Sequence, residues 1–311
     1  MRIVFMGTPE FAVESLRILV ENNYDVVGVV TMPDKPAGRG HKVQYSAVKE
    51  YALEKNLTIL QPEKLKDENF LAELSCLKAD IQVVVAFRML PEVVWNMPRM
   101  GTFNLHASLL PQYRGAAPIN WAIINGDRQT GVTTFFLTHE IDTGKIILQE
   151  KIDILATDNA GTVHDKLKVV GAELVRKTID MVIANQVNAE EQTNLMGTET
   201  VLKSAPKIFK ETCEIDIQQS VYQVHNFVRG LSPHPTAWIS VLIPGQTEKT
   251  ILKVYETEYE LINHDYAFGE IIIDTKKTAK IALKDGFLLL KTIQAPGKKR
   301  MEIGEYLRGL R

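Results

Sequence analysis

Short apolar segments alternate with amphipathic helical segments in the first third of the chain, and this alternation constrains the fold more than any other feature. Residues 11–21 place apolar side chains at positions 12, 13, 16, 19 and 20, the spacing of an amphipathic helix. A second helix is expected over 45–56, and strand-like runs occupy 3–6, 26–31, 79–87 and 101–106. Strands that alternate with helices form a parallel sheet with helices on both faces. The sequence therefore predicts an α/β fold with a Rossmann-like, mostly parallel sheet in its N-terminal part.

The pattern changes twice further along the chain. Segments 133–137 and 145–154 are expected to add a hairpin or antiparallel edge, and a long helix over 162–185 closes this part. After a polar stretch come a helix, five short β-type runs and a last helix, at 217–229, 237–243, 251–258, 269–274, 279–283, 286–294 and 301–310. Five strands at this spacing favour a small open β-barrel of the OB type. We therefore expect an N-terminal domain over 1–187, a linker over 188–206 and a C-terminal domain over 207–311.

The clearest chemistry lies at Asn104 and His106, where the last strand of the first part ends. Side chains in a strand alternate between faces, so this carboxamide and this imidazole point the same way. An amide donor beside a proton-transferring group suits the oxyanion that forms when a nucleophile adds to a carbonyl or formyl carbon. A lone strand histidine is more often a core residue, and asparagine often caps a turn. The abrupt stop at Pro111 and carboxylates further downstream favour the catalytic interpretation.

A carboxylate that reaches His106 would orient the imidazole and help move the proton that an attacking amine loses. Asp142 lies in a turn after another strand and is our candidate. Spacing alone does not separate Asp142 from Glu140 or Asp127. His139 is a competing imidazole, but no comparable amide lies beside it.

The loops that follow the first two strands are candidates for ligand contact. Residues 7–9 resemble a phosphate-binding turn, but they lack the further glycines of a dinucleotide fingerprint, which favours a simple strand-to-helix turn over an NAD or FAD site. Residues 33–42 combine two prolines and two glycines with Lys35, Arg39 and Lys42. Open α/β sheets bind ligands at the carboxyl ends of their strands. We expect a mobile cationic loop there, and both ligand contact and a solvated surface stay open as its role.

Composition limits the class of protein and of partner. No apolar run approaches the length of a membrane span, and none follows a basic N-terminus as in a signal peptide. Cys76 and Cys213 lack metal-ligand spacing, which predicts reduced thiols in a cytoplasmic protein. From residue 205 onward there are 15 Lys and Arg against 13 Asp and Glu, a balance that is not strongly basic. Any RNA contact must therefore come from a local face.

These motifs resemble those of the folate-dependent formyltransferases, and the resemblance covers essentially the whole chain. The segments that carry it are 4–11 (VFMGTPEF), 33–40 (PDKPAGRG), 104–111 (NLHASLLP), 114–118 (RGAAP), 142–144 (DTG) and 295–299 (APGKK). The Asn-x-His motif with its distant aspartate is similar to that of the whole superfamily. The 33–40 and 114–118 segments and the C-terminal half are similar to the branch that acts on charged tRNA.

The resemblance implies that 10-formyltetrahydrofolate donates its formyl group directly to the α-amine of methionine on initiator tRNA, without a metal. Asn104 and His106 would stabilise the tetrahedral oxyanion, and Asp142 would set the state of the imidazole. It further implies a folate site at Phe87, Arg88, Met89, Leu90, Ser108, Leu109, Leu110 and Pro111. The tRNA contacts that it implies are Lys35, Arg39, Lys42, Lys207, Lys298, Lys299 and Arg300. We expect a cytoplasmic monomer.

One segment departs from the family, and other functions stay open. The family commonly has glycine where this chain has Arg88, and residues 86–91 are one position shorter, so contacts with the pterin are expected to differ there. A formyltransferase for an amino-sugar nucleotide shares much of this two-part layout and is the alternative enzyme. A tRNA- or RNA-binding module with a relic catalytic domain is the alternative of another class, and the intact Asn-x-His and Asp set argues against it.

Overall fold

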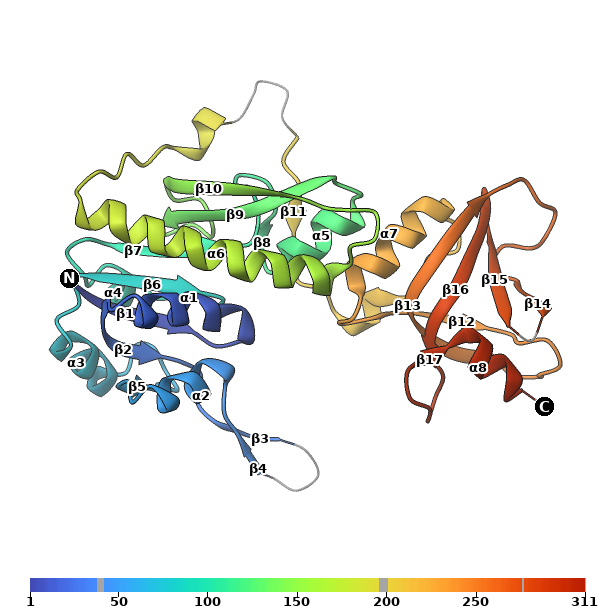
Figure 1. Cartoon of the computed structure of the whole chain (residues 1–311), viewed down its shortest axis with the longest axis horizontal. Coiled ribbons are helices and arrows are strands. Elements are labelled where there is room, and N and C mark those ends of the chain that lie inside the picture. The colour runs from blue at the N-terminus through green and yellow to red at the C-terminus, as the bar shows by residue number, and fades with distance from the viewer. Residues whose placement is uncertain (38–41, 196–200, 276, 311) are drawn as a thin grey trace. The chain divides into compact units, whose positions relative to one another are not determined.

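The structure of the protein is a computed structural model that describes residues 1–37, 42–195, 201–275 and 277–310 (Figure 1). The chain divides into two compact units. The N-terminal unit comprises Met1–Gly115, Gly131–Ile152 and His164–Ser204, and the C-terminal unit comprises Ala116–Thr130, Asp153–Val163 and Ala205–Arg311. Within the described residues, no helix has both the length and the apolar character needed to cross a membrane.

A sheet in the strand order β10-β9-β7-β6-β1-β2-β5 forms the centre of the N-terminal unit. The strands are β1 (Arg2–Gly7), β2 (Asp25–Val30), β5 (Ile59–Leu60), β6 (Ile81–Val85), β7 (Thr102–His106), β9 (Gln129–Phe136) and β10 (Ile146–Asp153). In the spatial order β5-β2-β1-β6-β7, each strand is parallel to the next. Strand β9 pairs with β7 in the antiparallel sense. The predicted parallel sheet and its antiparallel edge are therefore confirmed.

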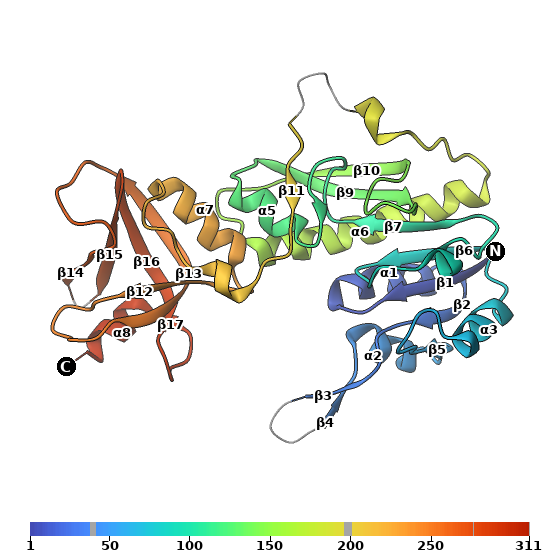
Figure 2. The same cartoon turned by 180° about the vertical axis from the view of Figure 1, so that it is seen from behind.

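Helices cover both faces of this sheet, as the alternation of segments predicts. They are α1 (Glu10–Glu21), α2 (Ala47–Glu54), α3 (Glu68–Cys76), α4 (Glu92–Trp95) and α6 (Ala160–Ile183). Val4 and Met6 of β1 lie in one apolar cluster with Phe70 of α3 and Val94 of α4. Because side chains alternate along a strand, the residues between them face the opposite side, where α1 and α6 lie (Figures 1 and 2).

The turn between β1 and α1 is tight, as predicted. A Cβ added at Gly7 would lie 2.7 Å from the Cβ of Ala12 and 3.0 Å from the carbonyl oxygen of Val85. Any side chain at this position would push the helix away from the end of the strand. The glycine therefore serves close packing between strand and helix.

The segment after β2 is only partly the loop that the sequence predicts. Its ends form two short antiparallel strands, β3 (Lys35–Ala37) and β4 (Lys42–Gln44), which pair Lys35 with Gln44 and Ala37 with Lys42. Residues 38–41, which include Arg39, lie outside the described residues. Prolines and glycines hide these strands from a search for alternating apolar residues, and backbone pairing rather than periodicity forms them.

An antiparallel sheet in the order β12-β13-β16-β15-β14, with β17 paired to β16, forms the C-terminal unit. The strands are β12 (Ala237–Val241), β13 (Thr250–Leu261), β14 (Ile271–Thr275), β15 (Thr278–Leu283), β16 (Gly286–Gln294) and β17 (Met301–Glu302). The helices are α5 (Pro118–Ile124), α7 (Val221–Leu231) and α8 (Ile303–Arg308). Apolar residues of α7 and α8 share one buried cluster with the sheet. The five predicted strands between 237 and 294 are confirmed and form one antiparallel sheet, flanked in sequence by a helix on each side as predicted.

Two helix boundaries in this unit differ from those predicted. The predicted helix over 217–229 begins later, because the Ser220 hydroxyl accepts from the Gln223 N–H and the Gln223 side chain accepts from the Ser220 N–H. This capping box fixes the start of α7 at Val221. The last predicted helix loses its first residues to the sheet, since Met301 and Glu302 pair with β16. The remaining short elements of the chain are β8 (Arg114–Gly115), β11 (Ser204–Ala205), η1 (Gln192–Leu195) and η2 (Lys210–Cys213).

Candidate active site

The predicted catalytic segment lies at the carboxyl edge of the sheet. Strands β1, β6 and β7 run parallel, so the loops that follow them meet at this edge. Asn104 and His106 occupy alternate positions of β7 and therefore face the same side, while Leu105 between them approaches Gly171 of α6. The side chains of Asn104 and His106 thus point away from α6.

The imidazole of His106 is buried and held by a backbone carbonyl. Its Nε2 lies 2.9 Å from the carbonyl oxygen of Tyr113. A carbonyl oxygen only accepts hydrogen bonds, so Nε2 is the protonated nitrogen of the neutral ring. The other nitrogen, Nδ1, lies 3.9 Å from Oδ2 of Asp142. Nδ1 is therefore the nitrogen that can gain or lose a proton without breaking the bond to Tyr113.

The structure places Asp142 beside His106, whereas His139 is exposed and lies 3.6 Å from Glu92. Oδ2 of Asp142 accepts a hydrogen bond of 2.9 Å from the backbone N–H of Gly115. This hydrogen bond holds the carboxylate in position beside the imidazole. Asp142 has a φ of 55°, in the left-handed region that non-glycine residues seldom adopt, and Tyr113 has a φ of 61°. Such conformations cluster at functional sites.

The carboxamide of Asn104 is half-buried and lies opposite Val84 and Phe135 in the sheet register. Among the residues that the structure describes, none forms a hydrogen bond with this carboxamide. A polar side chain in the middle of a sheet is normally hydrogen-bonded to its neighbours. Its two N–H donors are therefore available to a ligand at the edge where His106 also lies.

The predicted folate residues after β7 are mostly packed into the protein. Ser108 is fully buried and its hydroxyl donates to the carbonyl oxygen of Gln112 at 2.7 Å. Leu110 is also buried, and its N–H donates to the hydroxyl of Thr133 at 3.2 Å. The Thr133 hydroxyl donates to the carbonyl oxygen of Ser108 at 2.6 Å, and Gln149 donates to that of Leu110 at 2.8 Å. This network fixes the backbone of 108–111.

The loop over 86–91 contains the arginine that distinguishes this chain. The guanidinium of Arg88 donates to the carbonyl oxygens of Pro62 and Glu63, the latter at 2.9 Å. Burial lowers the pKa of Arg88. Met89 is 73% exposed, whereas Leu90 is buried and Phe87 is half-buried. The guanidinium thus anchors this loop to the neighbouring segment, and Met89 is the exposed large apolar side chain of the loop.

The cationic residues predicted to contact tRNA are distributed over both units. Lys35 and Lys42 belong to β3 and β4, and Arg39 lies outside the described residues. Lys207 is exposed, with its Nζ 5.2 Å from the centre of the Phe209 ring. Residues 298–300 are exposed on the turn between β16 and β17. Within this turn Arg300 pairs with Glu256 at 2.8 Å and stacks on Tyr255.

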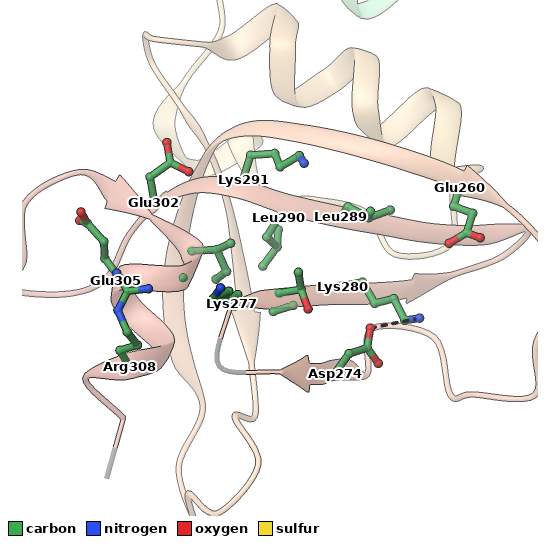
Figure 3. A pocket seen from close by; sticks show the side chains of 14 residues that line it. Glu260, Asp274, Lys277, Lys280, Leu289, Leu290, Lys291, Glu302, Glu305 and Arg308 are labelled. Atoms are coloured by element: carbon green, nitrogen blue, oxygen red, sulfur yellow. Dashed lines mark ion pairs between the residues drawn. The ribbon is translucent and has the colours of Figure 1, made fainter.

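A cavity of about 520 Å³ lies in the C-terminal unit, beside β14 to β17 and α8 (Figure 3). Its described lining residues carry balanced charges, with the cations Lys277, Lys280, Lys291 and Arg308 and the anions Glu260, Asp274, Glu302 and Glu305. Lys280 pairs with Asp274 at 3.4 Å, and Lys291 pairs with Glu258 at 2.8 Å. This balance does not favour a polyanion.

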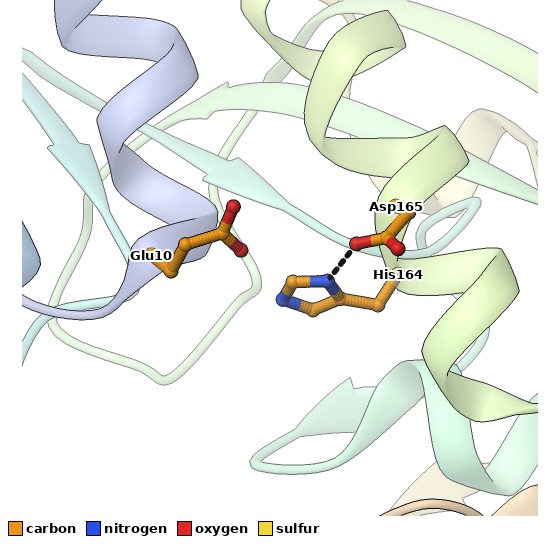
Figure 4. Close-up of side chains that lie close together, drawn as sticks. All are labelled: Glu10, His164 and Asp165. Atoms are coloured by element: carbon orange, nitrogen blue, oxygen red, sulfur yellow. Dashed lines mark hydrogen bonds and ion pairs between the residues drawn. The ribbon is translucent and has the colours of Figure 1, made fainter.

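A second polar cluster joins the start of α1 to α6 and comprises Glu10, His164 and Asp165 (Figure 4). One possible ligand atom of each residue lies within 4.8 Å of the others. The ammonium of Lys168 lies 2.6 Å from Glu10 and 3.1 Å from Asp165, so both carboxylates already have a cationic partner. The cluster therefore forms an ion-pair network between two helices.

Three groups at the site were not found from the sequence. The Tyr113 carbonyl and the Gly115 N–H belong to the backbone, and backbone groups leave no signal in residue type. Gln192 is buried in η1 and contacts both Asp142 and Arg114. A single glutamine in a polar connecting stretch gives no periodic signal. Its polar neighbours also give no indication that this residue is buried.

Comparison with known proteins assigns both parts of the chain. The formyl transferase family matches residues 1–179, and the formyl transferase C-terminal domain family matches residues 207–311. A methionyl-tRNA formyltransferase of Bacteroides thetaiotaomicron is 59% identical over 313 residues, covering 100% of this chain and 96% of the relative. A methionyl-tRNA formyltransferase of Parabacteroides distasonis is 59% identical over 312 residues, with the same coverage of 100% and 96%.

Solved structures share the fold at lower identity. The N-formyltransferase of Helicobacter canadensis, in complex with folinic acid and dTDP-3-aminofucose, has a TM-score of 0.66 and 21% identity. This likeness covers 94% of this chain and 98% of that one. HypX of Aquifex aeolicus, in complex with tetrahydrofolic acid, has a TM-score of 0.64 and 19% identity, covering 100% of this chain and 48% of that one. Identities this low show a shared fold.

Proposed function

The chain belongs to the methionyl-tRNA formyltransferase family, whose reaction is formylation of initiator methionyl-tRNA, and from this premise we propose how its residues perform the transfer. We propose 10-formyltetrahydrofolate as the donor and Asn104, His106 and Asp142 as the catalytic set. The observation that carries this proposal is the placement of Asn104 and His106 on one face of β7, with Asp142 3.9 Å from the imidazole.

The proposed reaction is direct transfer. The uncharged amine of methionine attacks the formyl carbon, a new C–N bond forms, and the carbonyl electrons move onto oxygen. Asn104 donates to this oxyanion, and its available carboxamide costs no internal hydrogen bond when it does so. The bond to N10 of the folate then breaks and the carbonyl reforms. The amine loses a proton and N10 gains one.

His106 and Asp142 would manage that proton. Since Nε2 already donates to Tyr113, the proton enters and leaves at Nδ1, either directly or through water. With Nδ1 protonated, the ring is a cation and can itself donate toward the oxyanion. The carboxylate of Asp142 stabilises that cation, and the Gly115 N–H keeps the carboxylate in place.

We propose that the donor lies against residues 108–111 and 86–91, at the carboxyl edge of the sheet. The hydrogen-bond network through Thr133 and Gln149 supports this role because it makes the backbone of 108–111 rigid. The buried side chains of Ser108 and Leu110 leave the backbone as the part of those two residues that offers contacts. Exposed Met89 would contribute an adaptable apolar surface.

We propose that cationic residues of both units contact the acceptor, initiator tRNA. These residues are Lys35, Arg39, Lys42, Lys207, Lys298, Lys299 and Arg300. Residues 1–187 would form the catalytic domain, 188–206 the linker and 207–311 the tRNA-binding domain. A monomer supplies every residue of the proposed catalytic set. Because charged initiator tRNA is used in translation, we place the enzyme in the cytoplasm.

The amino-sugar nucleotide alternative is weaker than the tRNA acceptor. The solved structure that carries dTDP-3-aminofucose is 21% identical, whereas the methionyl-tRNA formyltransferases are 59% identical over the whole chain. The test is to incubate the protein with labelled 10-formyltetrahydrofolate and one acceptor at a time. We expect transfer to charged initiator tRNA and none to uncharged tRNA or to dTDP-amino sugars. Preferred transfer to a sugar nucleotide would overturn the proposal.

A further inference from the structure

We propose that Gln192 is a positioning residue for formyl transfer, acting through Asp142, and that the short helix η1 in the connecting segment (residues 188–206) is thereby part of the active site. Gln192 is 2% exposed, although it lies in the polar stretch between the sequence domains. The inference rests on the catalytic role proposed for Asp142. It assigns a chemical role to a segment that the sequence presents only as a linker.

Every hydrogen-bonding position of the Gln192 carboxamide is occupied. Nε2 donates to the carbonyl oxygens of Asp142 at 2.8 Å and Gly144 at 2.9 Å. Oε1 accepts from Nε and Nη2 of Arg114, at 3.1 Å and 2.6 Å. Carbonyl oxygens only accept and a guanidinium only donates, so the orientation of the amide has a single solution. Such a side chain fixes both of the segments that it joins.

The first of these segments is the turn that carries Asp142. Its backbone is left-handed at Asp142, a conformation that persists only where the surroundings hold it. Gln192 holds the carbonyl of Asp142 itself and that of Gly144 two residues later. These two bonds set the direction in which the Asp142 side chain leaves the backbone. That direction determines the 3.9 Å separation from Nδ1 of His106.

The second segment holds His106 from its other side. Arg114 donates to the Gln192 side chain and directly follows Tyr113 in the sequence. The carbonyl oxygen of Tyr113 accepts from Nε2 of His106. Gln192 therefore connects the segment that holds the imidazole of His106 to the turn that carries the carboxylate of Asp142. Through these bonds the Gln192 side chain constrains the separation between the imidazole and the carboxylate.

The connecting segment reinforces the same turn a second time. The N–H of Tyr113 donates to the carbonyl oxygen of Lys203 at 2.7 Å, and the N–H of Lys203 donates to the Gln112 side chain at 2.8 Å. On the other flank Glu190 and Ile146 exchange two backbone hydrogen bonds of 2.8 Å. The segment is thus attached to the loops around the catalytic set at both of its described ends.

The test is a double-mutant cycle on the single-turnover rate of formyl transfer by the full chain, with both substrates saturating. Gln192→Leu keeps the approximate volume and removes both donors and the acceptor. We expect a rate loss of about 10- to 100-fold, because a small misplacement of catalytic groups has effects of this size. The KM values for tRNA and folate should change less than about threefold. Asn194→Ala, an exposed neighbour in η1, is the matched control and should keep the wild-type rate.

The cycle separates positioning from a purely structural role. If Gln192 acts through Asp142, Gln192→Leu should cost little in an Asp142→Asn background, because the group that it positions is already disabled. Equal losses in both backgrounds, or an unchanged rate in the single variant, would overturn the inference. If Gln192→Leu does not fold, Arg114→Met is the second variant, because it removes the hydrogen bonds between Arg114 and Gln192 from the arginine side. An unchanged transfer rate in Arg114→Met would also overturn the inference.

The cycle also distinguishes this inference from the proposed function. A slow Asp142→Asn enzyme with a wild-type Gln192→Leu enzyme would refute the role of Gln192 and leave the catalytic set intact. A fully active Asp142→Asn enzyme would refute the catalytic set and, with it, the role of Gln192.

Discussion

Replacing Asn104 by alanine separates catalysis from folding more cleanly than any other change at this site. The carboxamide has no hydrogen-bond partner among the described residues, so its removal leaves no buried donor or acceptor unpaired. The side chain is half-buried in a central strand, where exchange for alanine is expected to cost no more than about 1 kcal/mol in the free energy of unfolding. The loss of one preorganised oxyanion donor costs about 10²–10³ in kcat, or about 2.7–4 kcal/mol.

The assay compares kcat for Asn104→Ala with that of the natural chain, at saturating 10-formyltetrahydrofolate and charged initiator tRNA. Thermal unfolding of each protein checks that the fold is retained. Asn22→Ala is the matched control, because the Asn22 carboxamide caps α1 by donating to the carbonyl oxygen of Ile18 at 2.7 Å. That variant should lose a little stability and keep its kcat. A folded Asn104→Ala enzyme with a kcat within threefold of the natural value would exclude Asn104 as an oxyanion donor.

Three further predictions address the carboxylate, the tRNA surface and a buried histidine. Asp142→Asn keeps an acceptor for the Gly115 N–H but removes the charge, and kcat should fall by about 10²-fold or more because the imidazolium loses its partner; a loss below threefold would contradict this. The double variant Lys298→Ala, Lys299→Ala should raise KM for tRNA and leave kcat unchanged. It should also reduce the slope of log affinity against log salt by about one unit per lost phosphate contact. The control Lys177→Ala on α6 should change neither the KM nor this slope. Burial, and then the charge of Arg229, lowers the pKa of His225 to about 4. The unfolded chain binds this proton near pH 6.5, so the stability contribution of neutral His225 is present above pH 6.5 and is lost as the pH falls toward 4. Urea midpoints should therefore rise between pH 4.5 and pH 6.5, and His225→Gln should flatten that rise.

The sequence could predict the elements in which side-chain periodicity and packing agree. Strands β1 and β6 can be predicted because each is a short continuous apolar run, and helices α1 and α6 because apolar residues recur at helical spacing. Helix α5 was missed: it begins with Pro118 and belongs to the C-terminal unit, so packing against residues far away in the sequence defines it. Strands β3 and β4 were missed because proline and glycine obscure the alternation that normally marks a strand.

At the site, residue type revealed chemistry but not its supports. Asn104, His106 and Asp142 could be selected because carboxamide, imidazole and carboxylate have recognisable roles in proton and oxyanion chemistry. The structure brings His106 and Asp142 together and excludes His139 as a neighbour of that carboxylate. The Tyr113 carbonyl, the Gly115 N–H and Gln192 depend on how distant loops meet. No local pattern encodes such meetings.

The most direct test of the catalytic set is the single-turnover rate of formyl transfer to charged initiator tRNA by His106→Gln. The glutamine amide can still donate to the Tyr113 carbonyl in place of Nε2, but it supplies no group that gains or loses a proton at Nδ1. We expect a rate loss of about 10²–10⁴-fold with donor and tRNA binding retained. A folded His106→Gln enzyme that transfers formyl at the natural rate would contradict the catalytic role of His106.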